Sequence, residues 1–92
     1  MMLRVHQGPK KTVIRLPKRF DTDSLSAFSM SVRRASVTPE YVLDFGETVS
    51  VDSSALDVLR EFGRKLDARR GVFTLVNCRP QIRRMLKRLR VA

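Results

Sequence analysis

Several residue types are scarce in this chain of 92 residues, and each scarcity excludes a class of protein. A single cysteine, Cys78, excludes an internal disulfide framework and any zinc site built from clustered cysteines. No apolar run approaches the roughly 18 residues that a membrane span requires. The first six residues also lack the apolar core of a signal peptide. We therefore expect a reduced, cytoplasmic protein.

Residues that perform catalysis are scarce as well. His6 is the only histidine, and no Asp or Cys motif accompanies it. Cys78 has no activating histidine at a recognisable spacing. The sequence contains no cluster of metal ligands and no glycine-rich loop of the kind that holds phosphates. We expect a protein that is not an enzyme and that needs no cofactor or metal ion.

What is present suits one compact domain. The length fits a single domain over residues 1–92 and leaves no room for two. Hydrophobic residues make up 42% of the chain and charged residues 30%, which is typical of a globular protein with one modest core.

Positive charge is in excess and is unevenly distributed. The formal net charge is +10, from 19 Lys and Arg against nine Asp and Glu. Residues 1–20 and 79–92 each carry six basic side chains and no acidic one, whereas residues 21–58 carry seven acidic and two basic side chains. The basic flanks are either a solvated surface or a site for a polyanion such as nucleic acid or an anionic membrane surface.

Alternating and β-branched residues predict strands, and apolar stripes at helical spacing predict helices. The expected strands are residues 3–6, 12–16, 41–45 and 72–76, with a brief extended run at 49–51. The expected helices begin at 21–23, 52–54 and 80. Their apolar stripes are Leu25, Phe28, Val32 and Ala35, then Ala55, Leu59, Phe62 and Leu66, then Ile82, Met85, Leu86 and Leu89.

The order β-β-α-β-α-β-α indicates an α/β fold, because strands joined through helices form parallel crossovers. We expect a four-stranded mixed sheet covered by about three helices. Gly71, directly after Arg69 and Arg70, is expected to cap the second helix at its carboxyl end.

Residues at the predicted helix starts have a purely structural interpretation. Ser53, Asp52 and Asp21 each suit a helix cap, because a short side-chain acceptor binds free backbone N–H groups there. An acid also suits the positive end of the helix dipole. Likewise, the last helix presents either a solvated basic face or a phosphate-binding one, and its cations are Arg83, Arg84, Lys87 and Arg88.

Most of the chain, over residues 10–90, resembles the STAS domain, the fold of bacterial anti-sigma factor antagonists. The resemblance rests on a buried strand, an Asp-Ser-Ser at the next helix start, a strand after a glycine, and a proline that opens a short amphipathic helix. These four segments are residues 42–45, 51–56, 71–76 and 80–89. In addition, Arg19-Phe20-Asp21 is similar to the acidic entry of the family's first helix.

The resemblance implies a STAS-like sandwich and a regulatory role through protein binding. It implies that Ser53, the serine directly after the Asp, is phosphorylated by a partner anti-sigma factor with kinase activity. The dephosphorylated protein then binds the anti-sigma factor and frees the sigma factor, and phosphorylation releases it. A phosphatase is a further expected partner. The residues expected to contact the partner are Asp21, Asp52, Ser54 and Ala55.

Some features depart from the family pattern. Ala55 and Asp57 stand where glycines are common, which bears on how closely a kinase approaches Ser53. Many relatives continue with a further strand and helix, so a homodimer contact or a bound partner would cover the surface that this leaves. Two alternatives stay open: a STAS subunit of a transporter ATPase, and a small basic nucleic-acid-binding α/β domain. The second lacks a pair of exposed strand aromatics for base stacking.

Overall fold

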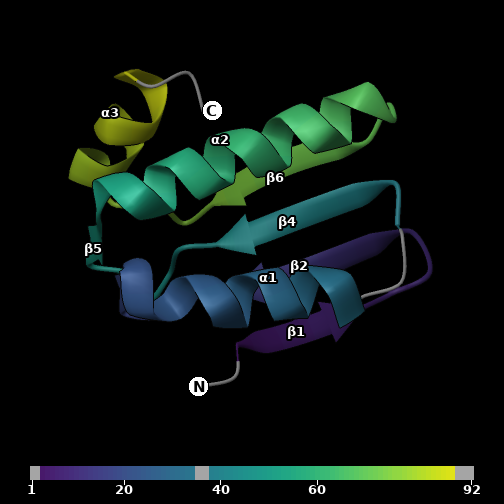
Figure 1. Ribbon diagram of the computed structural model, residues 1–92, viewed down its shortest axis with the longest axis horizontal. Helices are drawn as coiled ribbons and strands as arrows, with labels where there is room; N and C mark the ends of the chain where they lie inside the picture. Colours follow the sequence, from purple (N-terminus) through teal and green to yellow (C-terminus); the bar gives the residue numbers. More distant parts are fainter. Residues whose placement is uncertain (1–2, 35–37, 89–92) are drawn as a thin grey trace.

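The computed structural model describes residues 3–34 and 38–88. A four-stranded mixed sheet forms the centre of the molecule, as the sequence predicts, with strand order β1-β2-β4-β6 (Figure 1). The strands are β1 (Arg4–Gln7), β2 (Lys11–Arg15), β4 (Glu40–Asp44) and β6 (Val72–Val76). β1 pairs with β2 antiparallel, whereas β2 with β4 and β4 with β6 are parallel pairs.

A second, two-stranded sheet joins β3 (Arg19–Phe20) to β5 (Ser50–Val51) in parallel. The brief extended run at residues 49–51 predicts β5, but β3 has no counterpart among the predicted strands. Its two residues are too few to show any alternation of polar and apolar side chains. Pro17 separates β3 from β2, and Val49 donates its N–H to the carbonyl of Lys18 at 2.8 Å. The second sheet therefore continues the fold beyond the carboxyl end of the first.

Three α-helices and a short 3₁₀ turn complete the structure. They are η1 (Thr22–Ser24), α1 (Leu25–Arg34), α2 (Ser53–Ala68) and α3 (Pro80–Arg88). α1 and α2 lie side by side in front of the sheet, and α3 lies beside the start of α2 (Figure 1). Ala35 and Leu89, the last members of two predicted apolar stripes, lie outside the described residues.

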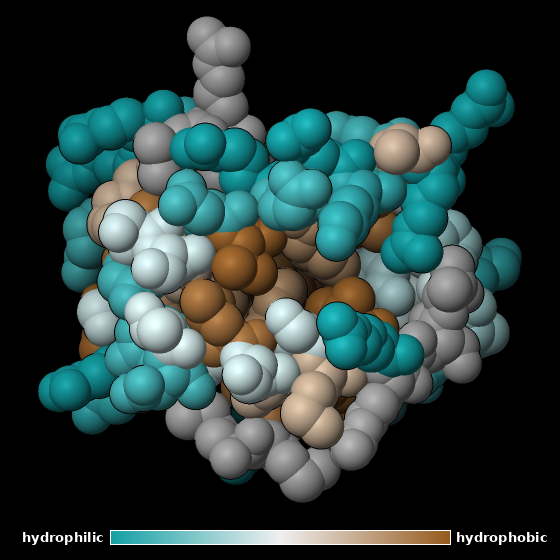
Figure 2. Space-filling view, viewed as in Figure 1, coloured by the Kyte–Doolittle hydropathy of each residue, from teal (hydrophilic) through white to brown (hydrophobic). Residues whose placement is uncertain are grey.

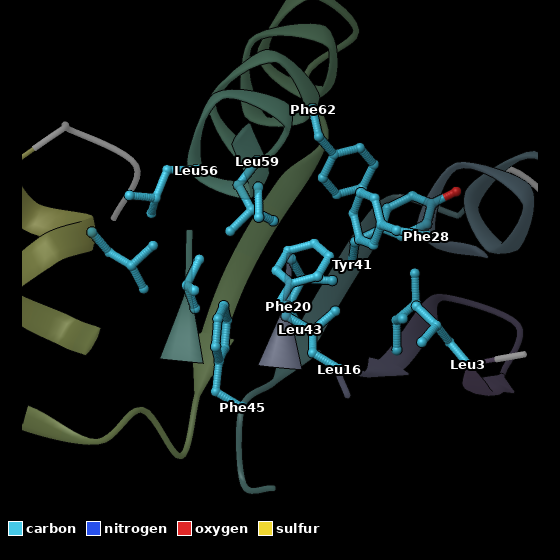
Figure 3. Close-up of a cluster of buried hydrophobic side chains, with 14 of the residues drawn as sticks. Leu3, Leu16, Phe20, Phe28, Tyr41, Leu43, Phe45, Leu56, Leu59 and Phe62 are labelled. Atoms are coloured by element: carbon cyan, nitrogen blue, oxygen red, sulfur yellow. The ribbon is translucent and has the colours of Figure 1, made fainter. Parts of the chain in front are cut away.

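The core lies between the sheet and the helices (Figure 3). Its centre is Phe62 of α2, whose ring makes edge contacts with Phe28, Tyr41 and Phe73 at centroid distances of 5.3 to 5.5 Å. Such pairs contribute about 0.5–1.5 kcal/mol each beyond the area they bury. Ile82 and Leu86 anchor α3 in the same cluster. Helices and sheet are thus held by one continuous set of apolar contacts.

At the carboxyl end of α2, the residue with left-handed backbone is Arg70 and not the expected Gly71. Arg70 has a φ of 58°, in the left-handed region, whereas Gly71 does not. The Gly71 N–H donates to the Leu66 carbonyl at 2.7 Å and the Arg70 N–H to the Asp67 carbonyl at 3.1 Å. This is the Schellman pattern with arginine at the position where glycine is usual. Gly71 serves another purpose, since a Cβ there would lie 3.0 Å from the Leu66 side chain.

The surface combines a polar exterior with one apolar strip. Figure 2 shows hydrophobic side chains gathered in the middle of the face that carries α1 and α2. A shallow groove of about 320 Å³ runs between these helices, with Phe28, Val32, Val58 and Phe62 among its lining. The molecule measures 32 × 27 × 20 Å. Among the described residues, none of the helices has the length and apolar character to cross a membrane.

Candidate functional site

The two predicted helix starts lie next to each other in space. Pairing of β3 with β5 places Phe20 beside Val51, and the Asp52 N–H donates to the Phe20 carbonyl at 3.1 Å. Asp21 and Asp52 each follow one of these paired strands directly. Asp21 and Asp52, which are 31 positions apart in the sequence, therefore lie at the same end of the molecule. The resemblance implies the same proximity of Asp21 to the Asp-Ser-Ser segment.

The Asp52 carboxylate joins the two helix starts. Its Oδ1 accepts the Ala55 N–H at 2.9 Å, which caps α2. Its Oδ2 accepts the Thr22 N–H at 3.2 Å and the Thr22 hydroxyl at 3.4 Å. Thr22 is a site residue that the sequence does not reveal, because only the fold brings it to Asp52.

Asp21 has the matching role on the other side of the site. It caps η1, with its Oδ1 accepting the Asp23 N–H at 3.1 Å and the Ser24 hydroxyl at 3.4 Å. The Ser24 hydroxyl also lies 3.0 Å from the Arg19 carbonyl. The cap interpretation of Asp21 and Asp52 is thus confirmed for both residues.

Ser53 is the first residue of α2, and its side chain is exposed. The interpretation of Ser53 as the helix cap is wrong, because Asp52 holds that position. In residues 3–34 and 38–88, no protein group forms a hydrogen bond with the Ser53 hydroxyl, and Ser54 beside it is exposed too. The first turn of a helix leaves backbone N–H groups free to meet an anion. The site therefore offers a free hydroxyl beside a positive helix end.

Ala55 differs from the other residues expected to contact a partner. Its side chain is fully buried in the core, so only Asp21, Asp52 and Ser54 remain at the surface. Asp57 lies one turn further along α2 and is exposed. The departure from glycine at position 55 consequently adds no bulk in front of the Ser53 hydroxyl, whereas the departure at position 57 adds a negative charge near it.

Asp44 and Glu47, two further acids of residues 21–58, form a separate cluster with Arg15. Asp44 accepts the Asn77 side-chain amide at 3.0 Å and the Gly46 N–H at 2.8 Å. Arg15 approaches Asp44 at 3.9 Å and Glu47 at 4.0 Å. The bond from Asn77 is the main reason that the pKa of Asp44 lies below its ordinary value, and Gly46 and Arg15 act in the same direction, whereas partial burial opposes them. Asp44 and Glu47 are therefore engaged with Arg15, at the ends of the strands.

A surface depression of about 430 Å³ lies beside η1. It is lined by Pro17, Lys18, Arg19, Asp21, Asp23 and Ser24. The lining thus combines two cations, Lys18 and Arg19, with two acids, Asp21 and Asp23. Both cationic and anionic groups of a partner can therefore form contacts with the surface next to Asp21.

The basic residues of α3 occupy the surface, as the sequence predicts. Arg83, Arg84, Lys87 and Arg88 are all exposed, while Ile82 and Leu86 of the same helix are buried. Arg79, which precedes α3, donates its Nε–H to the Thr48 carbonyl at 3.1 Å. The described residues contain no group of three or more side chains suited to a metal ion.

The comparisons with known proteins concern the family and the fold of the chain. The family model for the STAS domain matches residues 1–92. A STAS-domain containing protein of Pseudomonas aeruginosa (strain UCBPP-PA14) is 30% identical over 78 residues, which is 84% of this chain and 77% of that protein.

Two solved structures of the Bacillus anti-sigma factor antagonist SpoIIAA have the same fold. The phosphorylated form matches with a TM-score of 0.71 and 20% identity, over 92% of this chain and 80% of that one. The unphosphorylated form matches with a TM-score of 0.69 and 20% identity, over 92% and 81%. The family match over residues 1–92 and the 30% identical relative show that the chain belongs to the STAS domain family.

Proposed function

We propose that this protein is a non-enzymatic regulatory module of the anti-sigma factor antagonist kind, which binds a protein partner with serine-kinase activity and is released by phosphorylation of Ser53. One observation carries the proposal. The Ser53 hydroxyl is exposed and free of protein hydrogen bonds within the described ranges, at a helix start that Asp52 already caps. A serine that is not needed for capping is available for modification without loss of the fold.

Electrostatics give the modification its effect. A phosphate brings about −1.5 to −2 charges at neutral pH. The amino end of α2 tolerates this charge, because its free N–H groups and dipole favour an anion. Asp52 and Asp57 lie nearby, so the modified surface becomes strongly negative. A partner surface that accommodates a neutral hydroxyl then meets unpaired negative charge, which weakens binding by a few kcal/mol.

The docking surface is formed by the two joined helix starts. Ser53 is flanked by Asp52 and Ser54, and Asp21 caps the neighbouring helix start. The depression next to η1 extends this surface. The hydrogen bonds from Thr22 to Asp52 fix the two helix starts relative to each other. A preformed surface of this kind loses little conformational entropy when a partner binds.

The test is a comparison of captured partners. Wild-type protein and a Ser53→Glu variant serve as baits in a lysate of the source cells, with and without nuclease treatment, at moderate salt, with mass spectrometry of the bound proteins. We expect the wild-type protein to retain a protein with a serine-kinase fold and the Ser53→Glu variant to lose it. Ser29→Glu is the matched control, because Ser29 is an exposed serine in the middle of α1, away from the two helix starts. It adds the same charge and should retain the partner.

The same experiment separates this proposal from the alternatives. Equal recovery of a kinase-like partner by wild-type and Ser53→Glu baits would contradict a switch at Ser53. Recovery of nucleic-acid-associated proteins that disappears with nuclease treatment would instead assign the function to the basic surface of α3. Transporter ATPase subunits retained equally by all three baits would indicate a constitutive STAS subunit.

A further inference from the structure

Within residues 3–34 and 38–88, the outer edge of the sheet at β6 has backbone groups without a hydrogen-bond partner. The Val72 N–H donates to the Pro39 carbonyl at 2.7 Å and the Val76 carbonyl accepts the Phe45 N–H at 3.0 Å, so Val72, Thr74 and Val76 face β4. In a parallel ladder, alternate residues point their N–H and C=O groups to opposite sides. Phe73 and Leu75 therefore point theirs away from β4, and no strand lies beyond β6 in the described ranges.

β6 lacks the charged residues and prolines that often protect an edge strand from pairing. Residues 72–76 include no charged residue and no proline, and Val72 is 53% exposed. β1, at the opposite edge, carries Arg4, His6 and Gln7, all exposed. Charged edge strands resist the addition of another strand, whereas apolar β-branched ones favour it.

A groove runs between this edge and α2. It has a volume of about 380 Å³ and is lined by residues of α2, of β6 and of the turn between them. The α2 residues in the lining are Leu59, Arg60, Gly63, Arg64 and Asp67. Gly63 keeps the groove open, because its hydrogen leaves the space above the Phe73 ring free; a Cβ there would lie 3.7 Å from that ring.

The charges on the groove wall match an extended acidic segment. Arg60 and Arg64 are exposed and one turn apart on α2, which corresponds to a rise of about 6 Å. Arg64 also donates to Glu61 at 3.2 Å and keeps further N–H donors for a second acid, and Asp67 is the one acid in the lining, so the groove wall keeps an excess of positive charge. Alternate side chains of a β-strand are about 6.6 Å apart and lie on the same face. Two acids at positions i and i+2 of an added strand can thus each face one arginine. The intervening side chains lie on the other face of the sheet, beside Val72 and Val76.

We propose that the groove between α2 and β6 binds an extended, acidic segment of a partner protein, which adds to the sheet as a strand next to β6. Main-chain hydrogen bonds from Phe73 and Leu75 supply affinity, and Arg60 and Arg64 select acids at alternate positions. A second copy of this chain is not the occupant, because its own edge would bring a second pair of arginines to the groove. The groove lies about 15 Å along α2 from Ser53, so the inference is independent of the proposed switch.

The test uses a capped heptapeptide of alternating valine and glutamate, with a second peptide that carries lysine in place of glutamate. Binding to the full chain is measured by fluorescence anisotropy, and amide hydrogen exchange is measured residue by residue. We expect the glutamate peptide to bind and the lysine peptide not to. We also expect the amide exchange of Phe73 and Leu75 to slow by roughly tenfold or more at saturation, because these amides acquire acceptors.

Variants at Gly63 test the geometry without changing charge. Gly63→Leu fills the groove and should abolish peptide binding, while leucine is a better helix former than glycine and so preserves α2. Gly63→Ala is the matched control and should still bind, because its Cβ makes only an ordinary contact with Phe73. Arg60→Gln with Arg64→Gln should weaken binding by about tenfold or more, since two charge-assisted bonds are lost.

Three results would overturn the inference. The first is no binding of the glutamate peptide at concentrations up to about 1 mM, which corresponds to negligible affinity. The second is binding that leaves the Phe73 and Leu75 amides unprotected, which would mean attraction by net charge alone. The third is equal binding by the Gly63→Leu variant.

Discussion

At the scale of single residues, the site divides two tasks between neighbours. Asp52 supplies the structural contacts, as the cap of α2 and the acceptor for Thr22. Ser53 supplies an exposed hydroxyl that the described protein groups leave free. A sequence pattern alone leaves this division open, because serine and aspartate are both good capping residues. The structure resolves it in favour of Asp52.

This division predicts different costs for two alanine substitutions. Asp52→Ala should lower the free energy of unfolding by about 1–2 kcal/mol, because it removes a cap and the bridge to Thr22. Ser53→Ala should change it by less than about 0.5 kcal/mol, as is usual for exposed residues without contacts. Urea denaturation of both variants beside the wild-type protein measures these values. A loss at Ser53→Ala as large as that at Asp52→Ala would show that Ser53 is structural after all.

At the scale of elements, the strands and helices with clear patterns were predictable and the local connections were not. The apolar run at residues 72–76 predicts β6, and the stripe of Leu59, Phe62 and Leu66 predicts α2. β3 is too short to leave a pattern, and its pairing with β5 depends on the whole fold. The contact of Thr22 with Asp52 depends on that pairing in turn. Sequence reasoning thus placed Asp21, Asp52 and Ser53 at helix starts but missed Thr22, which joins the two starts.

The carboxyl end of α2 carries a strained residue whose replacement should stabilise the protein. Arg70 has a left-handed backbone, which is unfavourable for any residue with a Cβ and readily adopted by glycine. Arg70→Gly should therefore raise the free energy of unfolding by about 0.5–1 kcal/mol. Ala68→Gly, at the last helical residue, is the control and should lower it by up to about 1 kcal/mol. Thermal and urea denaturation both report these changes, and a destabilised Arg70→Gly protein would exclude backbone strain at this end.

At the scale of the whole molecule, charge is separated along the chain in a way that suits a docking protein. The acidic segment of residues 21–58 contains both helix starts of the candidate site, while most basic residues lie in residues 1–20 and 59–92. A net charge of +10 favours encounter with acidic surfaces. The acidic site therefore lies on a molecule of positive net charge. A phosphate at Ser53 changes the charge around the site by a larger fraction than it changes the net charge of the molecule.

The most direct measurement of the central claim is the phosphorylation state of Ser53 in the protein isolated from its own cells. Peptide mass spectrometry with fragmentation assigns phosphate to individual serines, and Ser26 and Ser29 on α1 serve as exposed internal comparisons. A switch at Ser53 predicts phosphate on Ser53 in a fraction of the molecules, none on the α1 serines, and only the unmodified form in complex with the partner. Phosphate that is absent from Ser53 under every growth condition, or present on Ser53 in the partner-bound form, would contradict it.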